Sequence, residues 1–169
     1  KSETVYNSVN YNLYNRAYYK CPRCNHFSGK LKMDVKNLYS SEYNKSVYKG
    51  ELKENFDKIN KIPSKKSDNY FRVKRVVKFI NTNMKFKNFD EISLLDIGSG
   101  LGIFPYKMKK KRFRITALDP DKKSCEHIKK NLKINTINGD FLKLKIKKKF
   151  NFISLNKVIE HISDPKKIL

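Results

Sequence analysis

Cysteines and long apolar runs are both scarce in this chain. It has only three cysteines among 169 residues, and two of them share one C-x-x-C pair, which excludes a disulfide framework. No apolar run approaches the roughly 20 residues of a membrane span, and no hydrophobic signal-peptide segment is present. We therefore expect one domain with a small appendage, located in the reducing cytoplasm.

Acidic residues are also few: 16 aspartates and glutamates stand against 39 lysines and arginines, a formal net charge of +23. Such a charge suits a nucleic-acid partner. However, 33 of these cations are lysines and only 6 are arginines, whereas arginine is preferred for bidentate contacts with phosphates and bases. AT-rich codons would also enrich lysine. We interpret the charge mainly as a solvated surface, and the clusters at residues 107–114 and 143–149 keep RNA as an alternative partner.

Only six glycines occur, yet three of them stand at alternate positions, Gly98, Gly100 and Gly102. They follow an apolar run at residues 93–97, which is short, continuous and aliphatic as in a buried parallel strand. Glycines allow a sharp turn and a close approach of the backbone to a ligand. A helix at residues 101–109 would direct its free N–H groups at the same crevice. These features predict a small-molecule site at the end of a strand.

The following sequence alternates short apolar strands with amphipathic helices. Strands are expected at residues 115–118, 134–137 and 150–154, and helices at residues 68–81, 121–132 and from about Pro165. Strands that alternate with helices predict βαβ units, a parallel sheet and right-handed crossovers. The expected fold is therefore a Rossmann-like, doubly wound α/β fold that contains its first four strands.

Two aspartates follow predicted strands at positions suited to a nucleoside. Asp119 lies 21 residues after Gly98, and its carboxylate can accept two hydrogen bonds from a ribose diol. Capping the helix at residues 121–132 is the alternative role for this carboxylate. Asp140 follows the third strand and can accept from an adenine amino group, while Phe141 covers the ring. An ordinary turn aspartate is the alternative at that position.

The run Asp96-Ile97-Gly98-Ser99-Gly100-Leu101-Gly102 differs from the dinucleotide fingerprint G-x-G-x-x-G, because its third glycine comes one residue earlier. It resembles motif I of the class I S-adenosylmethionine-dependent methyltransferases. The resemblance covers about residues 68–169 and implies S-adenosylmethionine as the cofactor. It further implies that Asp96 holds the loop or neutralises the cofactor's ammonium group. The implied cofactor-binding residues are Asp96, Gly98, Ser99, Gly100, Gly102, Asp119, Pro120, Asp140, Phe141 and Asn156.

A second resemblance lies in the run from Val158 to Pro165, V-I-E-H-I-S-D-P. Many small-molecule methyltransferases carry a V-x-E-H-x-x-D-P run after the fourth strand, among them ubiquinone-type, methionine-biosynthesis-type and sugar methyltransferases. Nucleic-acid amino methyltransferases carry an N/D-P-P-Y type motif there, which this sequence lacks. Because imidazole can accept a proton near neutral pH, His161 is a candidate general base. The alternative is that Glu160 and His161 shape the loop and cap the next helix.

Cys21 and Cys24 have the spacing of half a tetrahedral zinc site. Knuckles of this type usually turn left-handed at a glycine after the second cysteine, and Asn25 is the best substitute for it. The missing ligand pair is expected upstream of Lys1, and two unligated thiols are the alternative. We expect residues 1–30 to form a partial zinc-knuckle-like region, residues 31–67 a linker with short helices, and residues 68–169 a cofactor-binding domain. Because the chain begins without methionine and stops inside a helix, we expect a fragment truncated at its C-terminus.

The function expected from these features is transfer of a methyl group from S-adenosylmethionine to a small-molecule acceptor such as a sugar, a quinone or a similar metabolite. The sulfonium activates the methyl group, so the protein mainly supplies proximity, orientation and, where needed, a base. An RNA methyltransferase and an inactive cofactor-binding fragment are the alternatives. The sequence leaves the oligomeric state open.

Overall fold

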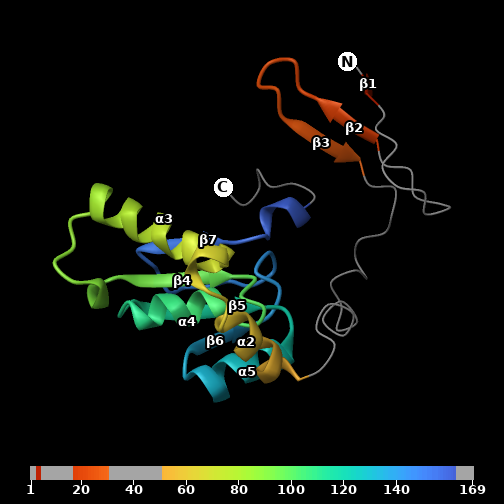
Figure 1. Cartoon of the computed structure of the whole chain (residues 1–169). Helices are drawn as coiled ribbons and strands as arrows, with labels where there is room; N and C mark the ends of the chain where they lie inside the picture. Colours follow the sequence, from red (N-terminus) through yellow and green to blue (C-terminus); the bar gives the residue numbers. More distant parts are fainter. Residues whose placement is uncertain (1–2, 5–16, 31–50, 163–169) are drawn as a thin grey trace. The chain divides into compact units, whose positions relative to one another are not determined.

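The computed structural model describes residues 3–4, 17–30 and 51–162 (Figure 1). The chain divides into two compact units, Lys1–Tyr43 and Asn44–Leu169. The predicted helix at Pro165 and residues 31–50 of the predicted linker lie outside the described residues.

The first unit contains a small antiparallel sheet. Its strands are β1 (Glu3–Thr4), β2 (Ala17–Lys20) and β3 (Phe27–Lys30), in that order across the sheet. Lys20 pairs with Phe27, so the six residues between them form the connection of a hairpin. This connection carries the C-x-x-C pair.

The second unit contains a parallel sheet, as the alternation of strands and helices predicted. Its strands are β4 (Ser93–Ile97), β5 (Arg114–Asp119), β6 (Asn135–Asn138) and β7 (Phe152–Leu155). Their order across the sheet is β6-β5-β4-β7, and every pair is parallel. Strands β4, β5 and β6 therefore follow one another across the sheet in one direction, and β7 lies on the other side of β4. The crevice beyond the carboxyl ends of β4 and β7 is the usual ligand position in such a sheet.

The four α-helices found in residues 51–162 bury apolar side chains in one cluster with β4 and β5 (Figure 1). They are α2 (Leu52–Asn60), α3 (Asp68–Asn83), α4 (Ile103–Lys110) and α5 (Lys122–Leu132). Leu94, Met108 and Ile128 lie at the centre of this cluster and are fully buried. The opposite side of the sheet carries Leu95 and Leu118, and the connection between β6 and β7 covers them with its own apolar side chains.

Helix α2 lies within the segment that the sequence suggested as a linker. Its Phe56 is only 5% exposed and packs edge-to-face on Tyr106 of α4, with ring centroids 5.2 Å apart. The same ring lies 5.7 Å from the imidazole of His127 in α5. Because one aromatic side chain anchors it to two helices, α2 packs as part of the second unit.

Ser67 caps α3, since its hydroxyl accepts a hydrogen bond from the Tyr70 amide at 3.3 Å. Phe71 lies on the solvent side of this helix and is 42% exposed.

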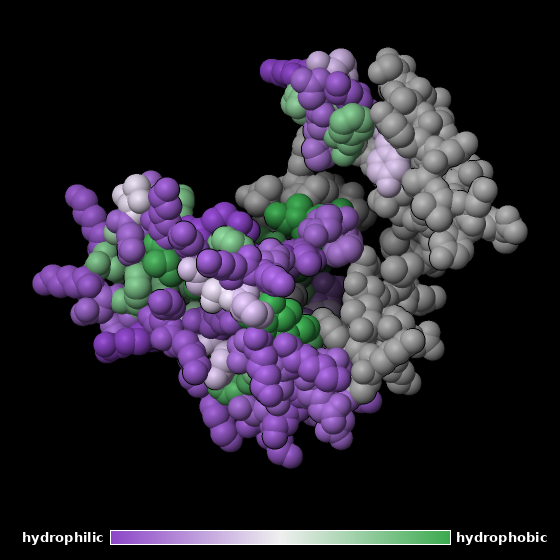
Figure 2. All heavy atoms as spheres, viewed as in Figure 1, coloured by the Kyte–Doolittle hydropathy of each residue, from purple (hydrophilic) through white to green (hydrophobic). Residues whose placement is uncertain are grey.

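The described part of the second unit also contains three short 3-10 helices: η2 (Ser64–Lys66), η3 (Phe89–Glu91) and η4 (Ile159–His161). In the part of the chain that the structure describes, no helix is long and apolar enough to cross a membrane. Hydrophilic side chains cover most of the face shown in Figure 2, with apolar residues in small separate patches.

Candidate active site

The glycine loop after β4 folds back over the end of β5. The amides of Gly98 and Ser99 both donate to the Leu118 carbonyl, at 2.8 and 3.2 Å. Gly98 has φ +70, and a Cβ at this residue would lie 2.4 Å from Cγ2 of Val158. Gly102 forms the N-cap of α4 with φ +76, and a Cβ there would lie 2.7 Å from Cγ1 of Ile128. Left-handed backbone and lack of space both require glycine at these two positions.

Asp119 joins the glycine loop to the end of β5. Its Oδ2 accepts a hydrogen bond from the Gly100 amide at 2.8 Å, and its Oδ1 accepts one from the Asp121 amide at 2.9 Å. Burial raises the pKa of this carboxyl, and the two amide hydrogen bonds partly oppose that shift. Asp119 is only 7% exposed and lies where the ends of β4 and β5 meet.

Asp96 is the other buried carboxylate of this region. Its Oδ1 accepts from the Ser154 hydroxyl at 2.6 Å and from the Asn156 amide at 3.2 Å. Its carbonyl oxygen accepts from the Ser99 hydroxyl at 2.8 Å, which ties the strand to the glycine loop. Burial raises the pKa of Asp96 to about 6, although these hydrogen bonds lower it in part. The charged form is thus held between β4 and β7 at a cost in desolvation.

Asp140 forms a turn in the structure. Its Oδ1 accepts from the Leu142 amide at 3.0 Å, and its carbonyl accepts from the amides of Lys143 and Leu144. Phe141 is half-buried against the apolar cluster on the second side of the sheet. Asp140 thus forms a turn, which was the alternative to an adenine contact. It also follows the end of β6, which is the position that an adenine contact would require.

Asn138 and Pro120 lie beside Asp119. The Asn138 side chain donates to the Asp119 carbonyl at 3.0 Å and to the Pro120 carbonyl at 3.1 Å. It therefore braces the turn that follows β5. The Pro120 ring itself is exposed.

His161 ends the 3-10 helix η4 and is exposed. Its amide donates to the Val158 carbonyl at 2.9 Å. Val158 in turn contacts Gly98, so the segment that carries His161 lies against the glycine loop.

Two residues of the site were missed by the sequence argument, Ser154 and Asn138. Ser154 is the register partner of Asp96 on the neighbouring strand, and Asn138 is the register partner of Asp119. Pairing the predicted strands by their ends would have placed Asn138 beside Asp119. It would have missed Ser154 by one residue, because the strand that carries Ser154 ends at Leu155 and not at Ser154.

The C-x-x-C pair lies in the turn between β2 and β3. The Cys21 amide donates to the His26 carbonyl at 2.8 Å, and the Asn25 amide donates to the Cys21 carbonyl at 2.9 Å. Asn25 has φ +56, as the knuckle interpretation predicted. Hydrogen bonds from the amide of Cys24 and then that of Arg23 hold the pKa of the Cys21 thiol below its usual range. Among the described residues, no group of three or more potential ligands surrounds a metal position.

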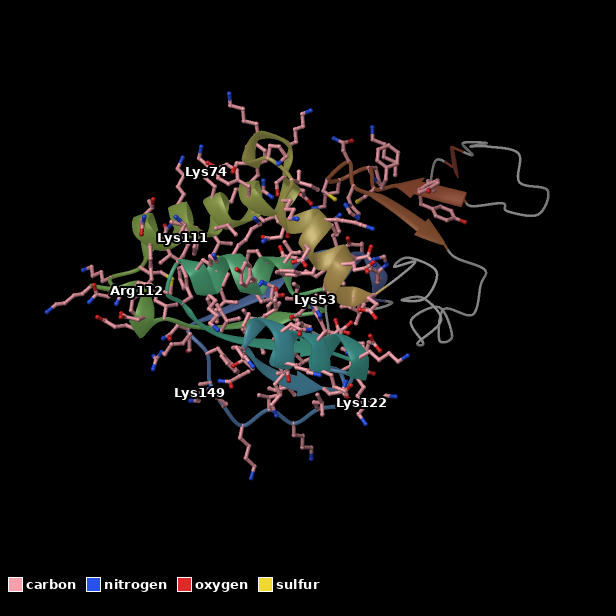
Figure 3. All side chains as sticks on the ribbon, turned by 60° about the horizontal axis from the view of Figure 1, so that its bottom comes forward. Lys53, Lys74, Lys111, Arg112, Lys122 and Lys149 are labelled. Carbon is pink, nitrogen blue, oxygen red and sulfur yellow. The ribbon has the colours of Figure 1, made fainter. Side chains whose placement is uncertain are left out.

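Basic side chains come from several elements of the second unit. Figure 3 shows Lys53 on α2, Lys74 on α3 and Lys122 on α5, while Lys111, Arg112 and Lys149 lie toward the end of the molecule at which α4 terminates. The glycine loop at residues 98–102 contains no cation. Lys111, Arg112 and Lys149, the labelled members of the clusters at residues 107–114 and 143–149, therefore lie away from this loop.

The residues at the carboxyl ends of the strands fit S-adenosylmethionine. A carboxylate can accept about four hydrogen bonds. Backbone amides supply two at Asp119, which leaves capacity for both hydroxyls of a ribose. The left-handed glycine loop brings backbone without side chains to the same place, and the buried carboxylate of Asp96 comes two residues before Gly98.

Comparisons with known proteins agree with this geometry. Residues 68–169 match a family described as a methyltransferase domain. Ubiquinone biosynthesis O-methyltransferase from Pelagibacter ubique is 33% identical over 105 residues, which cover 57% of this chain and 44% of that protein. The protein of the same name from Rickettsia prowazekii is 27% identical over 101 residues, covering 57% of this chain and 39% of that protein.

The chain thus spans less than half the length of these curated relatives. Among solved structures, coclaurine N-methyltransferase bound to N-methylheliamine and SAH aligns with a TM-score of 0.40 at 15% identity, over 68% of this chain and 42% of that one. The family match extends over more than half of the chain and includes both strand ends of the site. The chain belongs to the class I S-adenosylmethionine-dependent methyltransferases.

Proposed function

We propose that this chain binds S-adenosylmethionine at the carboxyl ends of β4 and β5 and uses it to methylate a small molecule. The observation that carries the proposal is the hydrogen bond from the Gly100 amide to Asp119. This bond joins the glycine loop to the carboxylate that would bind the ribose, and both lie at the edge of the sheet where such ligands bind.

Each part of the cofactor has a candidate partner. Asp119 would accept hydrogen bonds from the ribose hydroxyls, and Pro120 follows it in the chain. Asp140 and Phe141 would take the adenine amino group and ring face. The loop that contains Gly98, Ser99, Gly100 and Gly102 would bind the methionine moiety, with Asp96 and Asn156 behind it. When bound, S-adenosylmethionine supplies an electrophilic methyl group, and these residues supply its orientation.

The proposed acceptor is a small molecule with a nucleophilic oxygen. Two relatives are named as O-methyltransferases of ubiquinone biosynthesis, so an intermediate of that kind is the first candidate. The acceptor would enter between the ends of β4 and β7, where the strand order reverses. An RNA acceptor has less support at this site because the glycine loop carries no cation to bind phosphates.

His161 is the proposed general base for such an acceptor. Its exposed position on η4 lets solvent take up the proton that it would accept from a hydroxyl. We expect His161→Gln to slow methyl transfer about a hundredfold, at the lower end of the usual contribution of a general base. The measurement is the pH profile of kcat for the whole protein, together with the affinity for S-adenosylmethionine.

A base role predicts that the variant loses the acidic limb of that pH profile and keeps the wild-type cofactor affinity. If His161 only shapes the loop, the profile keeps its form while KM rises. Glu160→Gln changes the neighbouring exposed residue of the same 3-10 helix and serves as the control.

Calorimetric titration tests the cofactor assignment directly. We expect S-adenosylmethionine and S-adenosylhomocysteine to bind one site with dissociation constants in the micromolar range, and NAD to give no heat. Binding of NAD in place of both ligands would overturn the assignment, as would a folded protein that binds none of them. Methyl transfer is then measured as formation of S-adenosylhomocysteine with candidate phenols and catechols.

We also propose that Cys21 and Cys24 supply two of the four ligands of a structural zinc site. The support is their knuckle geometry, with Asn25 left-handed and backbone amides directed at the Cys21 thiol. Metal analysis of the purified protein should find zinc, and the double variant Cys21→Ser, Cys24→Ser should lose it. Equal zinc contents in both proteins would contradict the proposal.

A further inference from the structure

A hollow of about 420 Å³ opens at the end of the second unit away from the glycine loop. It lies where η3 leads into β4 and where α4 turns into β5, that is, at the amino ends of the strands. One strand of this length, about 16 Å, separates the two ends of the sheet. The volume is within the range of small-molecule sites. The residues that line it are Ile80, Asn81, Met84, Phe86, Lys87, Asn88, Phe89 and Arg112.

The apolar part of this lining contains two aromatic rings. Phe86 and Phe89 are both half-buried. Phe89 stacks on Phe113 with ring centroids 4.7 Å apart and an angle of 19° between the planes, so the orientation of its ring is fixed. Rings that are held in place in this way offer a π surface on which a planar group can stack.

Polar groups with both donor and acceptor atoms surround these rings. Asn81 and Asn88 are exposed, and the Asn88 side chain does not cap the 3-10 helix that follows it. A side-chain amide offers two N–H donors and one carbonyl acceptor, which is the pattern needed to bind the edge of a nucleobase.

Arg112 brings a cation to the rim of the hollow. It follows the last turn of α4 with φ +74, a conformation for which glycine is the usual residue. Its guanidinium lies 3.0 Å from Oδ2 of Asp90, while 79% of the side chain stays exposed. The exposed guanidinium is therefore in a position to meet a phosphate group at the rim of the hollow.

Further lysines extend the positive charge around this end of the sheet. Lys87 lines the hollow, Lys111 precedes Arg112, and Lys149 lies shortly before β7. Figure 3 shows Lys111, Arg112 and Lys149 toward this end of the molecule and Lys122 toward the other. Within residues 51–162, none of these three lysines forms an ion pair. The lysines and Arg112 make this end attractive to phosphate groups.

We propose that this hollow binds a nucleotide unit, either as a free nucleotide or within single-stranded RNA. The base stacks on Phe86 and Phe89 and meets the side-chain amides of Asn81 and Asn88 at its edge. Arg112 and Lys87 bind the phosphate. The site lies at the opposite end of the sheet from the cofactor residues, and it does not rest on the proposed methyl transfer.

The test is an NMR titration of the 15N-labelled protein with uridine monophosphate in the presence of saturating S-adenosylhomocysteine. Uridine monophosphate has no adenine that the cofactor site could bind. Saturating S-adenosylhomocysteine also fills that site, so the nucleotide cannot enter it. We expect the largest shifts at the amides of residues 86–89 and 112. Shifts confined to residues 96–102 and 119 would overturn the proposal.

Arg112→Gly is the diagnostic variant because glycine relieves the left-handed backbone while removing the guanidinium. We expect the affinity for uridine monophosphate to fall about tenfold. Lys133→Gly is the matched control, since Lys133 also ends a helix with φ +53, carries one positive charge and lies outside the hollow. This control should change the affinity less than twofold. Equal losses in the two variants would show only general attraction to a positive protein and would overturn the site.

A second variant separates stacking from charge. Phe86→Leu keeps the net charge and should weaken the binding of uridine monophosphate at least threefold, whereas unchanged affinity contradicts the stacking role.

A hexamer of uridylate identifies the source of the nucleotide. Tighter binding of the hexamer than of the monophosphate, with the same dependence on Arg112, identifies RNA, and equal binding identifies a free nucleotide.

Discussion

Replacing Asp119 by alanine should reduce the affinity for S-adenosylmethionine by about 10²- to 10⁴-fold. A hydrogen bond to a charged group contributes about 1.5–3 kcal/mol, and the carboxylate would accept two from the ribose. Each 1.4 kcal/mol is a tenfold change in the dissociation constant. The same substitution removes the acceptor of the Gly100 amide, so the glycine loop also loses its tie to β5. Calorimetric titration of both proteins measures the effect.

The control for this variant is Asp121→Asn. Asp121 lies two residues away and caps α5, where its Oδ2 accepts from the Ser124 amide at 3.1 Å. Asparagine is an equally good N-cap, so both the helix and the cofactor affinity should be preserved. Asp119→Ala must be shown to be folded by circular dichroism. A folded Asp119→Ala protein that binds within threefold of the wild type would remove Asp119 from the site.

The sheet was predictable from the sequence because its signals are local. The run S-L-L-D-I before the glycines gave the bounds of β4 correctly, since a mainly aliphatic segment ends where glycine begins. The last strand begins at Phe152, two residues later than predicted. Asn151 precedes it, and its side-chain oxygen accepts from the Ser93 amide at 2.9 Å, so this residue bonds to the neighbouring strand outside the regular ladder.

The parts that the sequence did not reveal depend on contacts between distant segments. Nothing local to Phe56 shows that a helix among lysines and asparagines docks on α4 and α5, because the only large buried group that it contributes is this one ring. The Ser154 hydroxyl contacts Asp96 across 58 positions of the chain. The proposal of Asp119 as a ribose ligand, in contrast, needs only local signals. These are its spacing after the glycines and its position at a strand end.

Asp96→Asn should make the protein more stable at neutral pH. The Asp96 carboxyl has a pKa of about 6 in the folded chain, mainly because of burial, whereas an unfolded aspartate titrates near 4. The folded state therefore holds this proton more tightly than the unfolded state. The free energy of unfolding accordingly falls as the pH rises from about 4 to about 6, and it levels off above that. A difference of about two pH units corresponds to about 3 kcal/mol.

Asparagine removes the charge and keeps a carbonyl oxygen that can accept from Ser154 and Asn156. We expect the variant to lack this decline between pH 4 and 6 and to exceed the wild-type stability above pH 6 by up to about 3 kcal/mol. Urea unfolding at a series of pH values measures both curves. A decline of the same size in the Asn variant would show that another group causes it.

Ser154→Ala provides an independent check on the assignment. Its hydroxyl donates to Oδ1 of Asp96 at 2.6 Å and so favours the charged form. Without it, the pKa of Asp96 should rise further, and the decline in stability should extend to higher pH. A midpoint that moves to lower pH, or that does not move, would contradict the interaction.

A carboxylate that lowers stability at neutral pH would be removed by substitution unless its charge were useful. Asp96 lies two residues before the glycine loop, and its carbonyl accepts a hydrogen bond from the Ser99 hydroxyl of that loop. In the proposed binding mode S-adenosylmethionine would bring positive charge to the loop, and a nearby cation would favour the ionised carboxylate. We therefore expect Asp96→Asn to bind S-adenosylmethionine about tenfold more weakly while unfolding at higher urea concentration. Opposite changes in stability and affinity are the mark of a residue kept for binding, and parallel changes would assign Asp96 to the fold alone.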